Sequence, residues 1–227
     1  MPAYFSAELF SFLEELKENN TREWFAENKT RYETLIREPA LRFIEDFREP
    51  LHDISPHFEA NAKTVGGSLF RIHNDVRFSK DKTPYKTHVG IHFRHERAKD
   101  AHSPGFYLHL EPGNCFTGAG LWRPETKLAY EIRSFIADHP DDWASIIGHK
   151  EFANRFELQG DSLKRPPKGF DPDHELVEDL KRKDFIAISK FTRGDVTSET
   201  FPNKLRDRLE SSADFMRFVC HAVGVPA

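Results

Sequence analysis

Polar side chains of the kinds that bind anions or move protons recur at every second position in three segments of the sequence, 69–78, 86–94 and 106–111. The positions between them are mainly apolar. Arg and Lys neutralise phosphates and carboxylates, His exchanges protons near neutral pH, and Asp, Glu and Tyr complete acid–base sites. The polar positions are Arg71, His73, Asp75 and Arg77, then Lys86, His88, His92 and Arg94, then Tyr107, His109 and Glu111.

These residue types predict a binding site for an anionic small molecule that carries a phosphate or a carboxylate, with hydrolysis as a conceivable reaction. Segment 79–85 joins the first two alternating segments and adds two lysines and a tyrosine that could also face an anion. We predict Asp75, His109 and Glu111 as catalytic acid–base candidates. The predicted ligand-binding residues are Arg71, Arg77, Lys80, Lys82, Tyr85, Lys86, His88 and Tyr107.

Other interpretations of the same residues stay open. Asp75 could simply form ion pairs with Arg71 and Arg77 on a solvated face. The basic segments and their interleaved aromatic residues could bind nucleic acid, helped by histidine protonation below pH 6, but the overall acidity argues against this. The charged face could also dock a protein partner without any chemistry. A metal trio drawn from Asp75, His88, His109 and Glu111 is conceivable, but no metal site or cofactor is predicted.

Alternation at period two requires strands, so the three segments predict an antiparallel sheet with one face on a core and the polar residues on the other. Segment 113–124 is rich in glycine and predicts turns. Before the sheet, apolar residues at helical spacing predict helices near 5–17, after an Asn20 cap, and over 40–52. After it we expect helices over 128–137, 141–147, 173–183 and 203–222, a strand over 184–191, and an extended loop at 163–170.

The expected fold class is therefore α+β, an antiparallel sheet with a helical N-terminal segment and C-terminal helices packed on it. We expect a single domain over 1–227, with a helical segment at 1–62, the sheet core at 66–124 and mixed helix and strand at 125–227. Whether the N-terminal helices cover the polar face decides between a site and internal ion pairs.

Composition limits the class of protein. The chain has 227 residues, a net charge of −4 and 21 Phe, so it can bury a large core and is not a generic nucleic-acid binder. The charge is uneven: residues 1–60 carry 13 acidic and 7 basic side chains, whereas 68–95 carry 6 basic and 2 acidic ones. No apolar run is long enough to span a membrane and no signal segment is evident, so we expect a cytoplasmic protein. Two cysteines cannot build a disulfide framework.

Several runs of residues together resemble a known family. They are Asn19–Phe25, Leu69–Arg71, the long run Asp75–Lys86, Pro104–Gly113 and Leu163–Phe170. The sequence resembles a bacterial and fungal family known only as the domain of unknown function numbered 2461. The resemblance implies no reaction, but the family's signature falls on the sheet face and the loop that the pattern of polar residues singles out.

Overall fold

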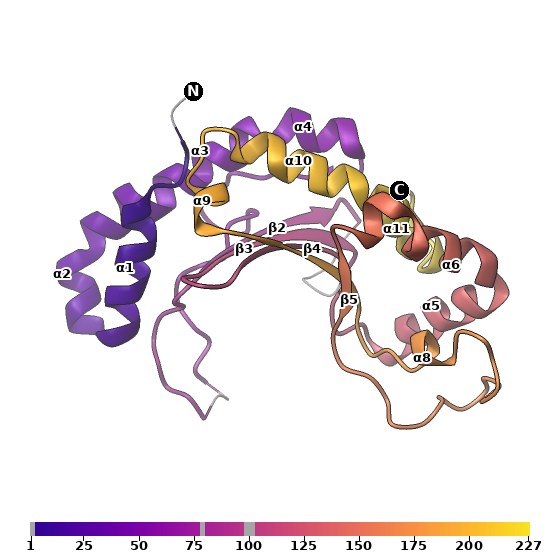
Figure 1. The fold of residues 1–227 in the computed structure, drawn as a ribbon. Coiled ribbons are helices and arrows are strands. Elements are labelled where there is room, and N and C mark those ends of the chain that lie inside the picture. Colours follow the sequence, from indigo (N-terminus) through magenta and orange to yellow (C-terminus); the bar gives the residue numbers. More distant parts are fainter. Residues whose placement is uncertain (1–2, 78–79, 98–102) are drawn as a thin grey trace.

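One antiparallel sheet organises the fold in the computed structural model, which describes residues 3–77, 80–97 and 103–227. Within these residues the sheet has six strands in the order β1-β2-β3-β4-β6-β5 (Figure 1). The strands are β1 (Phe58–Glu59), β2 (Val89–His95), β3 (Gly105–Leu110), β4 (Cys115–Leu121), β5 (Glu157–Gln159) and β6 (Phe185–Phe191). The fold is therefore α+β, as the sequence predicts.

Helices precede the sheet and follow it. The N-terminal set is α1 (Ala7–Glu18), α2 (Arg22–Tyr32), the π-helical turn η1 (Glu33–Arg37), α3 (Glu38–Asp46) and α4 (Arg48–Ile54). The C-terminal set is α5 (Thr126–Asp138), α6 (Pro140–Gly148), α7 (Lys150–Ala153), α8 (Val177–Leu180), α9 (Arg193–Val196), α10 (Phe201–Ser211) and α11 (Ala213–Ala222). None of the helices in the described part of the chain is both long and apolar enough to cross a bilayer.

The main core lies between helices and one face of the sheet. Figure 1 shows α3, α4 and α10 over this face, with α1 and α2 at one end and α5, α6 and α8 at the other. Phe47, between α3 and α4, stacks on Phe93 of β2 with ring centroids 5.5 Å apart, and both side chains are buried. Among the described residues, no helix lies over the opposite face (Figure 1). The N-terminal helices thus pack on the apolar face and leave the polar face uncovered.

Strand register assigns each side chain to a face, because directly paired residues in an antiparallel ladder point the same way. One paired row faces the helices, and the next row faces away from them. The inward row is Ile91, Leu108, Thr117 and Ser189, and the outward row is His92, Tyr107, Gly118 and Ile188.

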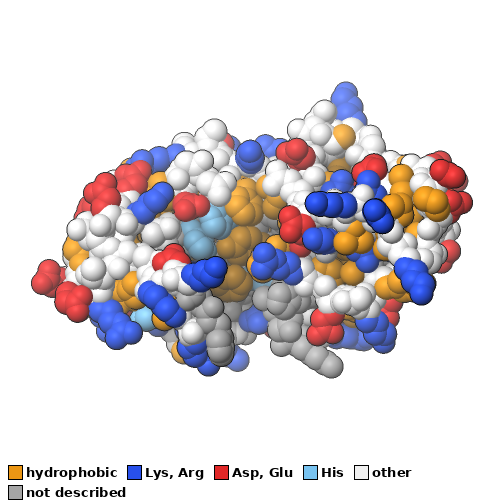
Figure 2. All heavy atoms as spheres, turned by 90° about the horizontal axis from the view of Figure 1, so that it is seen from below, with side chains coloured by type: hydrophobic (Ala, Val, Ile, Leu, Met, Phe, Trp, Pro, Cys, Tyr) orange, Lys and Arg blue, Asp and Glu red, His pale blue; other side chains and the backbone are white. Residues whose placement is uncertain are grey.

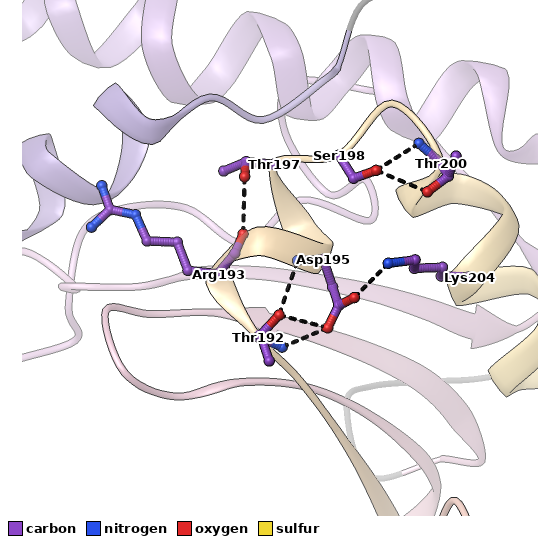
Figure 3. Close-up of polar contacts among 7 residues, drawn as sticks. All are labelled: Thr192, Arg193, Asp195, Thr197, Ser198, Thr200 and Lys204. Carbon is purple, nitrogen blue, oxygen red and sulfur yellow. Dashed lines mark hydrogen bonds and ion pairs between the residues drawn. The ribbon is translucent and has the colours of Figure 1, made fainter.

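Figure 3 shows the polar contacts that organise the turn between β6 and α10. Helix α9 begins with a capping box in which Thr192 and Asp195 exchange side-chain and backbone hydrogen bonds. Asp195 also pairs with Lys204 of α10, which is the main reason why the pKa of its carboxyl falls to about 2. Arg193 donates a hydrogen bond to the carbonyl oxygen of Ala7 at 2.8 Å, and so links α9 to the start of α1.

Two predictions about the sheet are wrong. Segment 69–78 is not a strand in its described part, since it makes only isolated bridges between Leu69 and Ile91 and between His73 and Tyr85. The chain leaves the sheet after Phe70. The alternation of polar and apolar residues in this segment reflects the burial of Ile72 and not a continuous ladder of hydrogen bonds. The glycine-rich segment predicted as turns contains β4, the central strand between β3 and β6.

Several helix boundaries also differ. The predicted helix over 173–183 is reduced to α8, and that over 203–222 is two helices that meet at Ser212. Segment 40–52 divides into α3 and α4 at Phe47. Thr21, and not Asn20, caps α2, because its hydroxyl accepts a hydrogen bond from the backbone nitrogen of Trp24 at 3.2 Å. The helical segment 1–62 also contains the short strand β1.

Candidate functional site

The uncovered face of the sheet holds a hollow of about 500 Å³. Figure 2 shows histidine and hydrophobic side chains together in this hollow, with Lys and Arg side chains near its rim. The described residues that line it are Phe70, Lys86, His88, His92, Ser103, Gly105, Tyr107, His109, Phe116, Gly118, Ala119, Gly120, Trp122, Ile186 and Ile188. We refer to this cavity as the sheet hollow.

Glycines make room for the sheet hollow. Gly118 lies on the outward face of β4, where a side chain would otherwise rise into the cavity. A Cβ atom there would lie 3.1 Å from the terminal methyl of Ile188. Gly120 has a φ of 122°, and a Cβ on it would collide with the carbonyl oxygen of Phe185. The floor of the hollow is therefore bare backbone flanked by Ile186 and Ile188.

A chain of hydrogen bonds runs along β3 on one wall. The hydroxyl of Tyr107 lies 3.1 Å from Nδ1 of His109, and Nε2 of His109 lies 3.2 Å from a carboxylate oxygen of Glu111. An ionised Glu111 carboxylate only accepts, so Nε2 donates to it and, in the neutral imidazole, Nδ1 accepts from the Tyr107 hydroxyl. This leaves the oxygen of Tyr107 as an acceptor toward the cavity.

Aromatic rings hold His109 in place. Its ring stacks on Phe116 at 4.7 Å on one side and on His88 at 4.5 Å on the other. Burial lowers the pKa of His109, opposed by the carboxylate of Glu111. Burial is also the main cause that lowers the pKa of His88 to about 4, and the neighbouring His109 adds to it. The protonation below pH 6 that the sequence suggests for these histidines would therefore begin for His88 only near pH 4.

His92 is the most deeply placed histidine of the sheet hollow. It is 7% exposed, and its Nδ1 atom is buried without a hydrogen-bond partner in the described part of the chain. Its ring meets Phe70 and Tyr107 edge-on. Burial, reinforced by Arg94, lowers its pKa to about 4, so His92 is neutral at physiological pH.

Lys86 is the one Lys or Arg among the described lining residues of the sheet hollow. Its ammonium donates to the carbonyl oxygens of Arg71 and His73, and no carboxylate pairs with it in the described structure. Burial lowers the pKa of Lys86, and the guanidinium of Arg71 lowers it further. One uncompensated positive charge thus stands at the edge of a largely apolar cavity.

The structure brings five of the predicted site residues together. Lys86, His88, Tyr107 and His109 line the sheet hollow, and Glu111 reaches it through His109. The other predicted residues lie elsewhere. Arg71 lines a separate cavity, while Asp75 and Arg77 form an exposed two-point ion pair that lowers the pKa of Asp75 to about 2.

The loop residues also lie outside the sheet hollow. Lys80 is exposed, and Lys82 donates to the carbonyl oxygen of Val76. Tyr85 is a buried core residue: its ring stacks on Phe25 with centroids 4.0 Å apart. Its backbone exchanges two hydrogen bonds with the side chain of Asn20. No group of three or more described His, Cys, Asp or Glu residues is arranged to hold a metal ion.

Sequence reasoning missed the apolar half of the sheet hollow, which comes from β4, β6 and their flanks. The missed lining residues include Phe70, Phe116, Gly118, Trp122, Ile186 and Ile188. A signal existed in β4, where Phe116, Gly118 and Gly120 alternate with Cys115, Thr117 and Ala119. Glycine is depleted in strands, and its abundance here suggested turns instead.

Comparison with known proteins gives a family. The model of the conserved hypothetical protein family DUF2461 matches residues 8–218. No curated protein and no solved structure matches the chain. The chain belongs to the DUF2461 family.

Proposed function

We propose that this DUF2461 member binds a small organic anion in the sheet hollow, with the flat apolar body of the ligand on the glycine floor and its acidic group at Lys86. The observation that carries the proposal is a largely apolar cavity with one partly buried lysine at its edge, Lys86, which pairs with no described carboxylate. A volume of about 500 Å³ lies within the usual range of small-molecule sites.

The walls favour a planar ligand. Four aromatic rings line the cavity, those of Phe70, Tyr107, Phe116 and Trp122, and the ring centroid of Tyr107 lies within 6.0 Å of those of Phe70 and Phe116. Trp122 is 47% exposed, and the guanidinium of Arg123 lies over its ring, 4.6 Å from the centroid. Burial of apolar area supplies most of the binding free energy in such sites, and a few polar groups fix the orientation.

The charge of the ligand follows from the groups that stand around it. Lys86 uses two of its three N–H donors on carbonyl oxygens, which leaves one for the ligand. His88 and His92 are neutral near pH 7, because their pKa values lie at about 4. An acidic group on the ligand would therefore pair with Lys86, whereas the nearby carboxylate of Glu111 is already held by His109.

Acid–base catalysis is the second candidate. The chain from Tyr107 through His109 to Glu111 supports it, because protonation of Nδ1 could accompany loss of a proton from the tyrosine hydroxyl. Burial raises the pKa of Tyr107, so the hydroxyl is protonated at rest. Hydrolysis of 4-nitrophenyl phosphate or acetate that is lost in Tyr107→Phe would support this candidate; equal release with and without wild-type protein would contradict it.

A thermal-shift screen tests binding. The panel holds aromatic carboxylates, aryl phosphates, their neutral analogues and short oligonucleotides, applied to wild type, Lys86→Gln and the matched control Lys150→Gln, whose lysine is exposed on α7. A ligand at 100 times its Kd stabilises a protein by about 2.7 kcal/mol. For a chain of this size we expect a shift of roughly 5–10 °C.

The proposal expects acidic aromatic compounds to raise the melting temperature of wild type and Lys150→Gln, with a clearly smaller shift in Lys86→Gln. Neutral analogues should shift all three proteins less. Equal shifts in Lys86→Gln and wild type would contradict the role of Lys86. Shifts given by oligonucleotides alone would favour the nucleic-acid surface instead.

A further inference from the structure

A second, smaller cavity of about 200 Å³ lies where α2 and η1 meet segment 69–73. It is distinct from the sheet hollow, although Phe70 forms part of the wall of both. The described residues that line it are Phe25, Lys29, Tyr32, Glu33, Arg37, Thr64, Leu69, Phe70, Arg71, Ile72 and His73. We refer to it as the helix cavity.

Positive charge is in excess around the helix cavity. Nη1 of Arg37 donates to both carboxylate oxygens of Glu33, at 2.7 and 3.0 Å, so the two charges cancel. Lys29 and Arg71 make no ion pair with any described carboxylate at salt-bridge distance. Two cationic side chains from different elements therefore border a small cavity that has no free described carboxylate in its lining.

A tyrosine hydroxyl adds a donor. The side chain of Tyr32 is 7% exposed and lines the helix cavity, and its hydroxyl has no hydrogen-bond partner among the described residues. Burial, followed by the charge of Glu33, raises the pKa of Tyr32 to about 12, so this group remains a donor throughout the neutral range.

The backbone at this place is also unusual. Residues 33–37 form a π-helical turn, which joins α2 directly to α3. Such turns are rare and occur often at functional sites. Here the turn follows Tyr32 and carries both Glu33 and Arg37 at the cavity wall.

We propose that the helix cavity is a second binding site, which takes the phosphate or carboxylate group of a small ligand. Arg71 and Lys29 supply the charge, and the Tyr32 hydroxyl donates a hydrogen bond to an oxygen of the anion. This site accounts for Arg71, which the sequence places with the ligand-binding residues but which does not line the sheet hollow. It stands independently of the proposed function, since neither Lys86 nor His109 lines it.

The test is a titration of the full-length protein with inorganic phosphate and, separately, with acetate, followed by NMR signals of the Tyr32 ring and the Arg71 backbone. The two anions distinguish a phosphate from a carboxylate site. Arg71→Gln removes the charge, and Tyr32→Phe removes only the hydroxyl from a ring that packs on Phe25. Arg22→Gln, at an exposed position of α2, is the matched control.

We expect one of the two anions to bind wild type saturably and to bind Arg71→Gln and Tyr32→Phe about tenfold more weakly, as loss of a hydrogen bond to a charged group predicts. Arg22→Gln should bind like wild type. Failure of both anions to shift these signals at roughly 20 mM would overturn the proposal, since that excludes even a site of millimolar Kd. Equal affinity in wild type, Arg71→Gln and Tyr32→Phe would overturn it as well.

Discussion

His92 should make the protein sensitive to acid, and the substitution His92→Phe should remove that sensitivity. The histidine is buried and neutral in the folded protein, with a pKa of about 4, whereas an unfolded histidine has a pKa of 6.5. As the pH falls below 6.5, the unfolded chain takes up a proton that the folded chain does not. The stability contributed by the neutral buried ring is thus present above pH 6.5 and is lost as the pH falls toward 4.

The size of the loss follows from the two pKa values. A pH of 5 lies about 1.5 units below the pKa of the unfolded histidine, which is therefore protonated, while His92 in the folded protein is still mainly neutral. One pKa unit corresponds to about 1.4 kcal/mol, so His92 should lower the free energy of unfolding by about 2 kcal/mol between pH 7 and pH 5. His88 shifts in the same direction, but it is present in both proteins and cancels in their difference.

Other charged groups around His92 do not reverse this loss of stability at low pH. Arg94 on the same strand adds to the lowering of its pKa, and Lys86 is a second cation in the same cavity. Among the titratable lining groups, His88 and His109 are neutral at pH 7, and the pKa of Tyr107 is raised. None of these groups is an anion that would hold a proton on His92.

Urea unfolding at pH 7 and pH 5 measures the effect. Wild type and His52→Phe, an exposed control on α4, should lose about 2 kcal/mol more between the two pH values than His92→Phe. Any packing cost of the larger phenylalanine ring acts at both pH values and drops out of the comparison. The reasoning is refuted if His92→Phe loses as much stability as wild type over this range.

Three further predictions concern the packing around the site. Phe47→Ala should lower the free energy of unfolding by about 3–5 kcal/mol, because it removes the buried ring that stacks on Phe93. Urea titration measures this change. A loss below about 1 kcal/mol would mean that α4 does not pack on the sheet. Asn20→Ala should cost about 2 kcal/mol in the same assay, since it leaves two backbone groups of Tyr85 without a partner. Gly120→Ala should lower the melting temperature by several degrees through backbone strain, and an unchanged value would contradict the left-handed conformation at this residue.

Local pattern predicts the sheet well where pairing is continuous. β2 and β3 lie within the predicted alternating segments to within a few residues, and their polar and apolar faces are those that the period-two pattern indicates. The same pattern is wrong at 69–78, because alternation describes which side chains are buried and not whether a neighbouring strand pairs with them. Ile72 is buried there, yet in the described part of this segment the backbone forms only two isolated β-bridges, at Leu69 and His73.

The shortened helix at 173–183 has a local chemical cause. The carboxylate of Asp171 accepts a hydrogen bond from the backbone nitrogen of Asp173, and Nδ1 of His174 accepts one from that of Leu176. Side chains that bind nearby backbone nitrogens compete with helix formation. The apolar spacing predicts a helix but carries no information about this competition, so only α8 forms.

The candidate site is predictable to the extent that it lies on strands. Register brings Tyr107 and His109 of β3 to one face, and Lys86 and His88 precede β2 on the same side. The loop cations are different, because the paths of residues 71–77 and 80–82 depend on tertiary contacts such as the pairing of Asn20 with Tyr85. Spacing in the sequence therefore predicts their charge but not their distance from the sheet hollow.

The central claim is that the sheet hollow binds an apolar anion, and a titration with 8-anilinonaphthalene-1-sulfonate tests it most directly. This probe combines flat rings with one acidic group, and its fluorescence rises in an apolar site. Gly118→Leu fills the floor of the hollow, and Gly148→Leu at an exposed helix end is the matched control. We expect saturable binding of one probe per chain to folded wild type and Gly148→Leu, much weaker binding to Lys86→Gln, and none to Gly118→Leu. Equal binding to Gly118→Leu and wild type, with both proteins unfolding cooperatively, would contradict the account.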